Sequence, residues 1–342
     1  MFGSKVQRLV SLAGLFAISL PTLIAADDSI IGNITLPVWN HPTGVVGAAT
    51  PQVTACANAG NIAVTYNEGP SDVTSKVLNG LKNNQARGNF FVNATWLYTQ
   101  QYAMILQRAY NDGHFIGMTY RVPNDNPAAM NDDQLKQDIL NDAKTIQTLI
   151  GVSPKYVRLH YTDPPDTRTE HILSDLGFTL VGYNLDTQDY NFKTNPTGVA
   201  DVYRKTFHTQ QETYDSLGSF VSVQYDIPDT GSYLAVNDVV KAIHENGYTM
   251  VRLDGCLNDK TPYKSAADAK TFVGDKFSFG TPGYHQGQTL APADAKDSNV
   301  TSSNGEVSDK AAAAPKSSAS IINGSVMAVV ISSVVSFVAA QF

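Results

Sequence analysis

Short apolar runs rich in β-branched residues alternate with segments of helical periodicity along most of the chain, and this order restricts the possible folds strongly. The runs typical of strands are residues 61–66, 89–92, 114–118, 155–159, 178–185, 220–225 and 248–253. Between several of them, apolar residues recur three or four positions apart; the longest such segment begins at Asn131 or Asp132 and ends near Ile150. Repeated β-then-α units of this length predict a mainly parallel sheet with helices outside it, open or closed as a barrel.

The first predicted strand ends in two polar residues, Asn67 and Glu68, which are followed by a Gly69-Pro70 turn. In α/β folds the loops that leave the carboxyl ends of the strands converge, and ligands bind among them. Asn67 and Glu68 are therefore the first candidates for a functional site.

Both ends of the chain have the composition of targeting segments. Lys5 and Arg8 precede an apolar run over residues 9–24, which is typical of a secretory signal peptide. Residues 326–342 are apolar, lack a basic flank and follow small residues, which predicts a glycosylphosphatidylinositol (GPI) attachment signal; a transmembrane anchor is the alternative. The predicted divisions are a signal peptide (1–26), an N-terminal extension (27–55), one α/β domain (56–262), a Ser/Ala/Gly-rich stalk (263–320) and the GPI signal (321–342).

The two cysteines, Cys56 and Cys256, lie near the two ends of the patterned region. In an exported protein we expect them to form a disulfide bond that ties the first strand to the last; two buried free thiols are the alternative. Sequons at Asn33, Asn93 and Asn299 agree with export and predict N-glycosylation. We therefore expect a secreted protein of the cell surface or cell wall, GPI-anchored to the plasma membrane.

Charge argues against one class of partner. The formal net charge is −7 at pH 7 and no cluster of Lys or Arg occurs, whereas nucleic-acid binding needs a basic surface. The acidic balance suits a neutral or cationic partner instead.

Seven segments of the patterned region follow one another in an order that a known family shares. They are TYNEGP, GNFFVNATW, DGHFIGMTYR, IGVSPKYVRLHY, NLDTQDY, SVQYDI and GYTMVRLDGCLND. Through them the chain resembles the polysaccharide deacetylase (NodB-homology, carbohydrate esterase) family, and the surroundings of both cysteines resemble fungal chitin deacetylases. The resemblance implies an α/β fold of the distorted (β/α) barrel type that acts on N-acetylglucosamine polymers, with chitin, chitosan or a related wall polysaccharide as partner.

The resemblance also implies a chemistry in which one Asp and two His hold a divalent metal, a second Asp is the base and another His is the acid. It places Glu68, Thr119 and Pro123 at the metal-ligand positions, Asn67 at the base and Tyr225 at the acid. Beside these, it assigns a supporting catalytic role to Arg158 and Asp189, and a substrate-binding role to Tyr161, Asp186 and Tyr190.

Most of the reacting positions carry residues that are unsuited to this chemistry. The amide of Asn67 cannot accept a proton from water, and Pro123 offers no metal ligand. A phenol such as that of Tyr225, with an ordinary pKa near 10, is a poor acid at neutral pH. We therefore expect no bound metal, absent or strongly impaired deacetylation, and a carbohydrate-associated module. The rings of Tyr161, Tyr190 and Tyr225 stack on sugars in this hypothesis, with packing in the core as the alternative.

Two other functions stay open. Glu68, His160 and Asp186 are candidates for a rebuilt zinc or cobalt site that keeps deacetylase activity on chitin or on a smaller N-acetylated amino sugar. Otherwise His160 and His114 are structural residues of a loop and of the sheet. The last possibility is a structural surface protein that binds no sugar.

Overall fold

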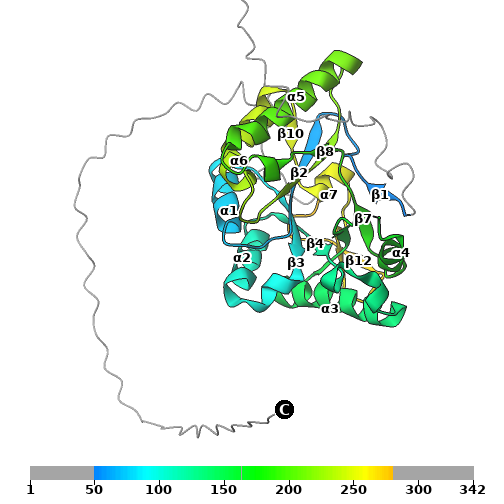
Figure 1. Cartoon of the computed structure of the whole chain (residues 1–342). Helices are drawn as coiled ribbons and strands as arrows, with labels where there is room; N and C mark the ends of the chain where they lie inside the picture. The colour runs from blue at the N-terminus through cyan, green and yellow to red at the C-terminus, as the bar shows by residue number, and fades with distance from the viewer. Residues whose placement is uncertain (1–49, 163, 280–342) are drawn as a thin grey trace, which may run out of the picture. The chain divides into compact units, whose positions relative to one another are not determined.

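The structure is a computed structural model that describes residues 50–162 and 164–279 (Figure 1). The predicted signal peptide, the GPI signal, most of the predicted stalk and the sequons at Asn33 and Asn299 lie outside these residues. None of the helices in the described part of the chain has the length and apolar character that a membrane span requires.

A parallel sheet of nine strands forms the centre of the described domain (Figure 1). Its order is β1-β7-β6-β4-β3-β2-β9-β8, with β10 also paired to β2, and every pair in it is parallel. The strands are β1 (Gln52–Val53), β2 (Asn61–Asn67), β3 (Asn89–Asn93), β4 (Phe115–Tyr120), β6 (Tyr156–Leu159), β7 (Thr179–Val181), β8 (Leu185–Asp186), β9 (Phe220–Tyr225) and β10 (Thr249–Met250). The predicted mainly parallel architecture is confirmed, and the first predicted strand lies at its centre.

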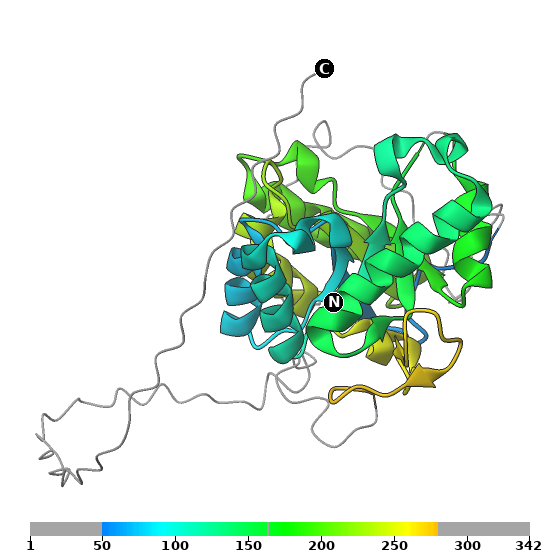
Figure 2. The same cartoon turned by 90° about the horizontal axis from the view of Figure 1, so that it is seen from below.

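Helices surround the sheet, as the two views in Figures 1 and 2 show. They are α1 (Thr74–Asn83), α2 (Gln100–Asn111), α3 (Asp132–Ile150), α4 (Thr167–Asp175), α5 (Pro196–Tyr214), α6 (Ser232–Glu245) and α7 (Leu253–Leu257). The single 3₁₀ turns are η1 (Ala94–Tyr98), η2 (Pro123–Asp125), η3 (Pro127–Ala129) and η4 (Asp189–Asn191). Helix α3 begins at Asp132, at the predicted start, and a capping box between Asn131 and Gln134 holds its first turn; α5 was not predicted.

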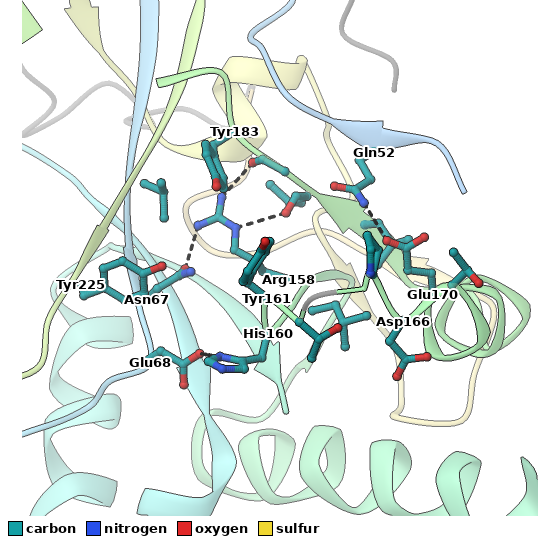
Figure 3. Close-up of a pocket in the computed structure, with 18 residues that line it drawn as sticks. Gln52, Asn67, Glu68, Arg158, His160, Tyr161, Asp166, Glu170, Tyr183 and Tyr225 are labelled. Atoms are coloured by element: carbon teal, nitrogen blue, oxygen red, sulfur yellow. Dashed lines mark hydrogen bonds and ion pairs between the residues drawn. The ribbon is translucent and has the colours of Figure 1, made fainter. Parts of the chain in front are cut away.

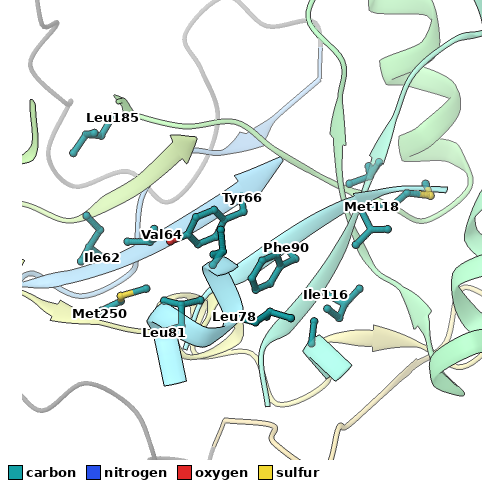
Figure 4. Packing of buried hydrophobic residues seen from close by; sticks show 14 of the residues in the cluster. Ile62, Val64, Tyr66, Leu78, Leu81, Phe90, Ile116, Met118, Leu185 and Met250 are labelled. Carbon is teal, nitrogen blue, oxygen red and sulfur yellow. The ribbon is translucent and has the colours of Figure 1, made fainter. Parts of the chain in front are cut away.

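The side of β2 that faces the helices is packed with apolar side chains (Figure 4). Ile62, Val64 and Tyr66 alternate along the strand, and each is at most 1% exposed. The Tyr66 ring stacks on the Phe90 ring of β3 with 5.1 Å between their centroids. Burying a side chain of this size stabilises a fold by about 1.5–3 kcal/mol, so this face anchors β2. The opposite face, with Thr65 and Asn67, is left for polar contacts.

The expected disulfide bond joins Cys56 to Cys256, whose Cα atoms lie 4.6 Å apart. It connects the segment before β2 to α7, which follows β10, and β10 pairs with β2. The bridge therefore ties the first and last parts of the sheet together, and the alternative of free thiols is wrong.

The folded domain extends further at both ends than the sequence predicted. Strand β11 (Tyr263–Lys264) pairs with β5 (Ser153–Pro154) and with β12 (Phe272–Val273), inside the predicted stalk. The Tyr263 side chain is fully buried, so the chain cannot leave the domain at residue 262. Strand β1 lies in the predicted N-terminal extension and pairs with β7. The predicted boundaries at 56 and 262 are corrected accordingly.

Candidate functional site

A cavity of about 570 Å³ opens at the carboxyl edge of the parallel strands (Figure 3). Its wall is formed by Gln52 of β1, by residues in and after the last parts of β2, β6, β7 and β9, and by the start of α4. Asn67 and Glu68, the first candidates from the sequence, belong to this wall, as do Arg158 and Tyr225.

Arg158 of β6 fixes the orientation of Asn67. Because side chains alternate along β2, Thr65 and Asn67 point to the same side of the sheet. Arg158 Nη1 donates to Thr65 Oγ1 at 2.8 Å and to Asn67 Oδ1 at 2.7 Å. The amide oxygen of Asn67 is thus occupied, and Nδ2 is the end of this side chain that remains for a ligand.

The loop after β2 is held by Asp226, which follows β9. Its Oδ1 accepts a bond from the Gly69 N–H at 3.1 Å, and its Oδ2 accepts one from the Thr74 hydroxyl at 2.7 Å. A Cβ at position 69 would lie 2.1 Å from Asp226 Oδ2, so only glycine fits there. Burial raises the pKa of Asp226 to about 7. These contacts hold Glu68 in a left-handed backbone conformation (φ 68°) at the cavity wall.

Both carboxylate oxygens of Glu68 have partners. Oε1 lies 2.7 Å from His160 Nδ1, and Oε2 accepts a bond from Asn93 Nδ2 at 3.1 Å. The Trp96 indole donates to the backbone oxygen of Glu68 at 2.9 Å. His160 also lines the cavity, and with Nδ1 on Glu68 its Nε2 is the ring nitrogen left for a ligand. Glu68 and His160, two of the three residues considered for a rebuilt metal site, are therefore in contact.

Asn93 is buried, which corrects its prediction as a glycosylation site. The residue is 6% exposed, and Nδ2, the atom that would carry the glycan, donates to Glu68. Its Oδ1 accepts a bond from the Thr95 N–H at 3.1 Å and caps η1. The Asn-x-Thr pattern at this place reflects a helix cap, since Asn is a preferred capping residue.

The residues at the implied metal positions do not fit a bound metal. Thr119 is 1% exposed and donates its hydroxyl to the Phe91 carbonyl oxygen at 2.9 Å, while Pro123 begins η2 and has no ligand atom in its side chain. Asp186 lies outside the cavity wall and accepts a bond from the Tyr190 hydroxyl at 3.3 Å. Across residues 50–162 and 164–279, no three or more His, Cys, Asp and Glu side chains are grouped to hold a metal. The rebuilt three-residue cluster is thus not assembled.

Aromatic rings lie in and beside the cavity. Tyr161 is 76% exposed, and Tyr183 and Tyr190 are each 44% exposed, so core packing is the wrong explanation for Tyr161 and Tyr190. Tyr225 is half-buried, and the Tyr190 ring meets it edge-on with 6.4 Å between the centroids. Burial raises the pKa of the Tyr183 and Tyr225 phenols, so both stay protonated at neutral pH.

Asp189 supports the wall from behind and is not part of it. Its side chain is fully buried, and its Oδ2 accepts a bond from the Tyr225 N–H at 2.8 Å. Its backbone oxygen accepts a bond from the Gly231 N–H at 2.9 Å. Burial raises the pKa of Asp189 to about 7, and its Oδ1 has no hydrogen-bond partner in the described residues. Asp189 therefore positions the end of β9.

The cavity-wall residues that the sequence analysis missed include Gln52, Asp166, Glu170 and Tyr183. Tyr183 was hidden inside the predicted strand 178–185, although Gly182 marks the point where β7 has already ended. Gln52 lies in the predicted extension and donates to Glu170 Oε1 at 3.0 Å, a contact between segments 118 residues apart that nothing local in the sequence indicates.

Comparison with known proteins agrees with this architecture. The family profile described as polysaccharide deacetylase matches residues 54–181. The chain carries a polysaccharide deacetylase domain. A chitin deacetylase of Colletotrichum lindemuthianum is 27% identical over 218 residues, which cover 63% of this chain and 86% of that protein.

Solved structures confirm the predicted distorted (β/α) barrel of the domain. The structure of the chitin deacetylase from the fungal pathogen C. lindemuthianum superposes with a TM-score of 0.55 at 25% identity, over 63% of this chain and 95% of that one. The fold also occurs in a structure described as a CE4 family pseudoenzyme from Bacillus anthracis (TM-score 0.50, 12% identity, 61% of this chain and 69% of that one).

Proposed function

We propose that this protein binds chitin or a related wall polysaccharide in the cavity and does not deacetylate it by the family's metal-dependent route. The bond between Asn67 and Arg158 carries the proposal. At the position where the family's chemistry needs a base, an amide has its only acceptor atom engaged by a guanidinium. Glu68 keeps its charge, but both of its oxygens already have partners.

The missing groups have a large expected effect on rate. A positioned base and a positioned acid each contribute about 10²- to 10⁴-fold. Asn67 cannot act as the base, and the raised pKa of Tyr225 makes its phenol a still weaker acid. We expect acetate release at least about 10⁴-fold slower than in a family member with both groups.

The aromatic surroundings of the cavity support sugar binding. Tyr161, Tyr183 and Tyr190 are exposed side chains, and exposed aromatic rings can stack on the apolar faces of sugars. The similar protein of Colletotrichum lindemuthianum is named a chitin deacetylase, which makes chitin the first ligand to test. A purely structural protein has no need of a cavity lined by the exposed rings of Tyr161 and Tyr183.

The location of the protein is part of the proposal. The signal-peptide pattern of residues 1–26 and the apolar segment 326–342 support a secreted protein with a GPI anchor at the cell surface or wall. A version that ends before Ile321 is expected in the medium, whereas the full chain stays on the cell and is released by phosphatidylinositol-specific lipase. Cell-bound protein that still contains residues 326–342 would contradict the lipid anchor.

Binding and acetate release, measured on the same purified protein, test the proposed function. Chitin oligomers are expected to bind in titration calorimetry, and Tyr161→Ala is expected to weaken this binding. Acetate is expected to stay at background with zinc or cobalt present. Tyr98→Ala is a matched control, because Tyr98 is 79% exposed and does not line the cavity. Absence of binding to any chitin or chitosan oligomer would overturn the proposal.

The contact between Glu68 and His160 favours a second candidate function, a deacetylase with a rebuilt site. A carboxylate on one ring nitrogen orients a histidine so that the other nitrogen can bind a metal or accept a proton. If this candidate is correct, acetate release is lost on chelation, returns with zinc or cobalt, and disappears in His160→Ala. If the first is correct, His160→Ala changes no acetate signal.

A further inference from the structure

Arg158 is a buried cation whose hydrogen bonds all go to neutral acceptors. The residue is 5% exposed. Beside Thr65 and Asn67, it donates to the backbone oxygens of Val181 at 3.1 Å and Gly182 at 2.9 Å. Burial lowers its pKa to about 10. The guanidinium lies over the Phe91 ring, 4.5 Å from its centroid, but none of the ion pairs of the described residues includes it. A buried cation without a counter-ion is unfavourable, so the cavity floor carries a positive charge that an anion can pair.

The neighbouring carboxylates are engaged elsewhere. Glu68 is bonded to His160 and Asn93, and Asp189 bonds the backbone of Tyr225. At the other side of the cavity in Figure 3, Glu170 accepts a bond from Gln52, and burial raises its pKa. None of these carboxylates is bonded to the guanidinium.

The polar groups beside the guanidinium that remain for a ligand can act as donors. A guanidinium has five N–H bonds and Arg158 makes four hydrogen bonds, so one N–H remains. Asn67 offers Nδ2, because its oxygen faces Arg158. The protonated hydroxyls of Tyr183 and Tyr225 also line the cavity, and neither has a hydrogen-bond partner in the described part of the chain. Positive charge and donors together match an anionic oxygen ligand.

We propose that this floor, formed by Arg158, Asn67, Tyr183 and Tyr225, binds a carboxylate group of an acidic sugar. The inference rests on the proposed function, since it adds a preference for carboxylate-bearing sugars among the wall polysaccharides that the cavity binds. A ligand carboxylate takes the remaining Arg158 N–H and the Asn67 amide, and it supplies the missing counter-charge. An aspartate at position 67 would supply that charge from within the protein. With asparagine at this position, the counter-charge has to come from the ligand.

A neutral glycan cannot use this charge. The carbonyl oxygen of an N-acetyl group also accepts from the Asn67 amide, but it leaves the guanidinium unpaired. Charge-assisted hydrogen bonds are roughly twice as strong as neutral ones. We expect an acidic sugar to bind about tenfold or more tightly than the same sugar with its carboxylates esterified.

The test compares tri-galacturonate with its methyl ester, which differs only in charge and the added methyl groups, on the purified protein by titration calorimetry. The parent protein is expected to prefer the acid about tenfold or more. Asn67→Asp is expected to abolish this preference, because the new carboxylate pairs with Arg158. The control Asn141→Asp makes the same charge change at an exposed position of α3 and is expected to keep the preference.

Tyr183→Phe keeps the inference testable if Asn67→Asp fails to fold. It removes one donor from a partly exposed ring, so binding of the acid is expected to weaken several-fold while binding of the ester stays the same. Equal binding of acid and ester by the parent protein overturns the inference, as does acetate binding as tightly as tri-galacturonate, which would indicate a small-carboxylate site. Chitin-oligomer binding measured alongside separates the two proposals: if it persists without a preference for acids, only this inference fails.

Discussion

The wall of the cavity and the frame behind it differ in how their polar groups are satisfied. In the frame, Asp226 and Asp189 accept hydrogen bonds from the backbone N–H groups of Gly69 and Tyr225. In the wall, side chains also bond to one another, as Asn67 does to Arg158 and Glu68 to His160. The contacts that hold the loops at this sheet edge are therefore separate from the contacts that line the cavity.

The largest expected effect is the gain of a metal site when the residues at the implied reacting positions are replaced and Asp226 and Asp189 are kept. The variant combines Asn67→Asp, Glu68→Asp, Thr119→His, Pro123→His and Tyr225→His. We expect stoichiometric zinc by elemental analysis, and turnover only after binding, because proton transfer tolerates errors in geometry less well than ligation does. The matched control retains Asn67 and is expected to bind zinc without turnover. A folded but zinc-free variant would show that the frame does not hold the ligand positions.

Removing the disulfide bond should lower the stability of the fold and leave ligand binding at the cavity wall unchanged. Cys56→Ala combined with Cys256→Ala is expected to lower the unfolding free energy by about 2–5 kcal/mol, measured by denaturant titration. Chitin-oligomer affinity at low denaturant is expected to stay within about twofold of the parent value, since neither cysteine lines the cavity. If a folded double variant lost its affinity for chitin oligomers, the claim that the contacts holding the fold are separate from the cavity wall would be wrong.

Asp226 gives the frame a pH dependence. Its pKa is about 7 in the folded protein and about 4 when unfolded, so the folded state binds more protons between these values. The contribution of Asp226 to the unfolding free energy therefore falls as pH rises from about 4 to about 7. Asparagine does not titrate, so the stability of Asp226→Asn relative to the parent should improve over this range by on the order of 2 kcal/mol.

Denaturant titrations at pH 5 and pH 8 measure this change. Asp133→Asn is the control, because the Asp133 side chain is 97% exposed, and it is expected to show no such trend. A difference between Asp226→Asn and the parent that is the same at both pH values would mean that Asp226 does not titrate in this range.

The smallest expected effect is a loss of oligomer affinity at the cavity wall with almost no change in stability. Tyr161→Ala removes an exposed ring, so the unfolding free energy should change by less than about 0.5 kcal/mol. Loss of one stacked ring is expected to weaken chitin-oligomer binding about fivefold in titration calorimetry. Unchanged affinity would remove Tyr161 from the sugar site.

Local patterns predicted the sheet because strand alternation and helix caps depend on neighbouring residues. Helix α5 was not predicted because it contains Gly198 and several Thr, which are weak helix formers. Gly198 is required, since a Cβ there would lie 2.2 Å from the Phe192 ring. Strand β11 was not predicted because a strand of two residues shows no periodicity in the sequence. Its partner β5 is also far away in the chain.

The site was predictable in its residue types and not in its contacts. The residue types of Glu68 and His160 suggest a pair, but only the fold brings together two residues that are 92 positions apart. The buried charge of Arg158 depends on which acceptors surround it, and these come from the strands β2 and β7 and from the loop after β7. Asn93 shows the opposite case, in which a tripeptide pattern predicted a modification and burial excludes it.

Acetate release from chitin oligomers by the purified, unmodified protein tests the central claim most directly. The assay is run with chelator, with zinc and with cobalt, beside a family member that has the complete set of reacting residues. We predict that acetate stays at background in all three conditions while the same preparation binds the oligomers. Acetate release that a chelator abolishes and zinc or cobalt restores would contradict the account, and its loss in His160→Ala would assign the activity to the Glu68 and His160 pair.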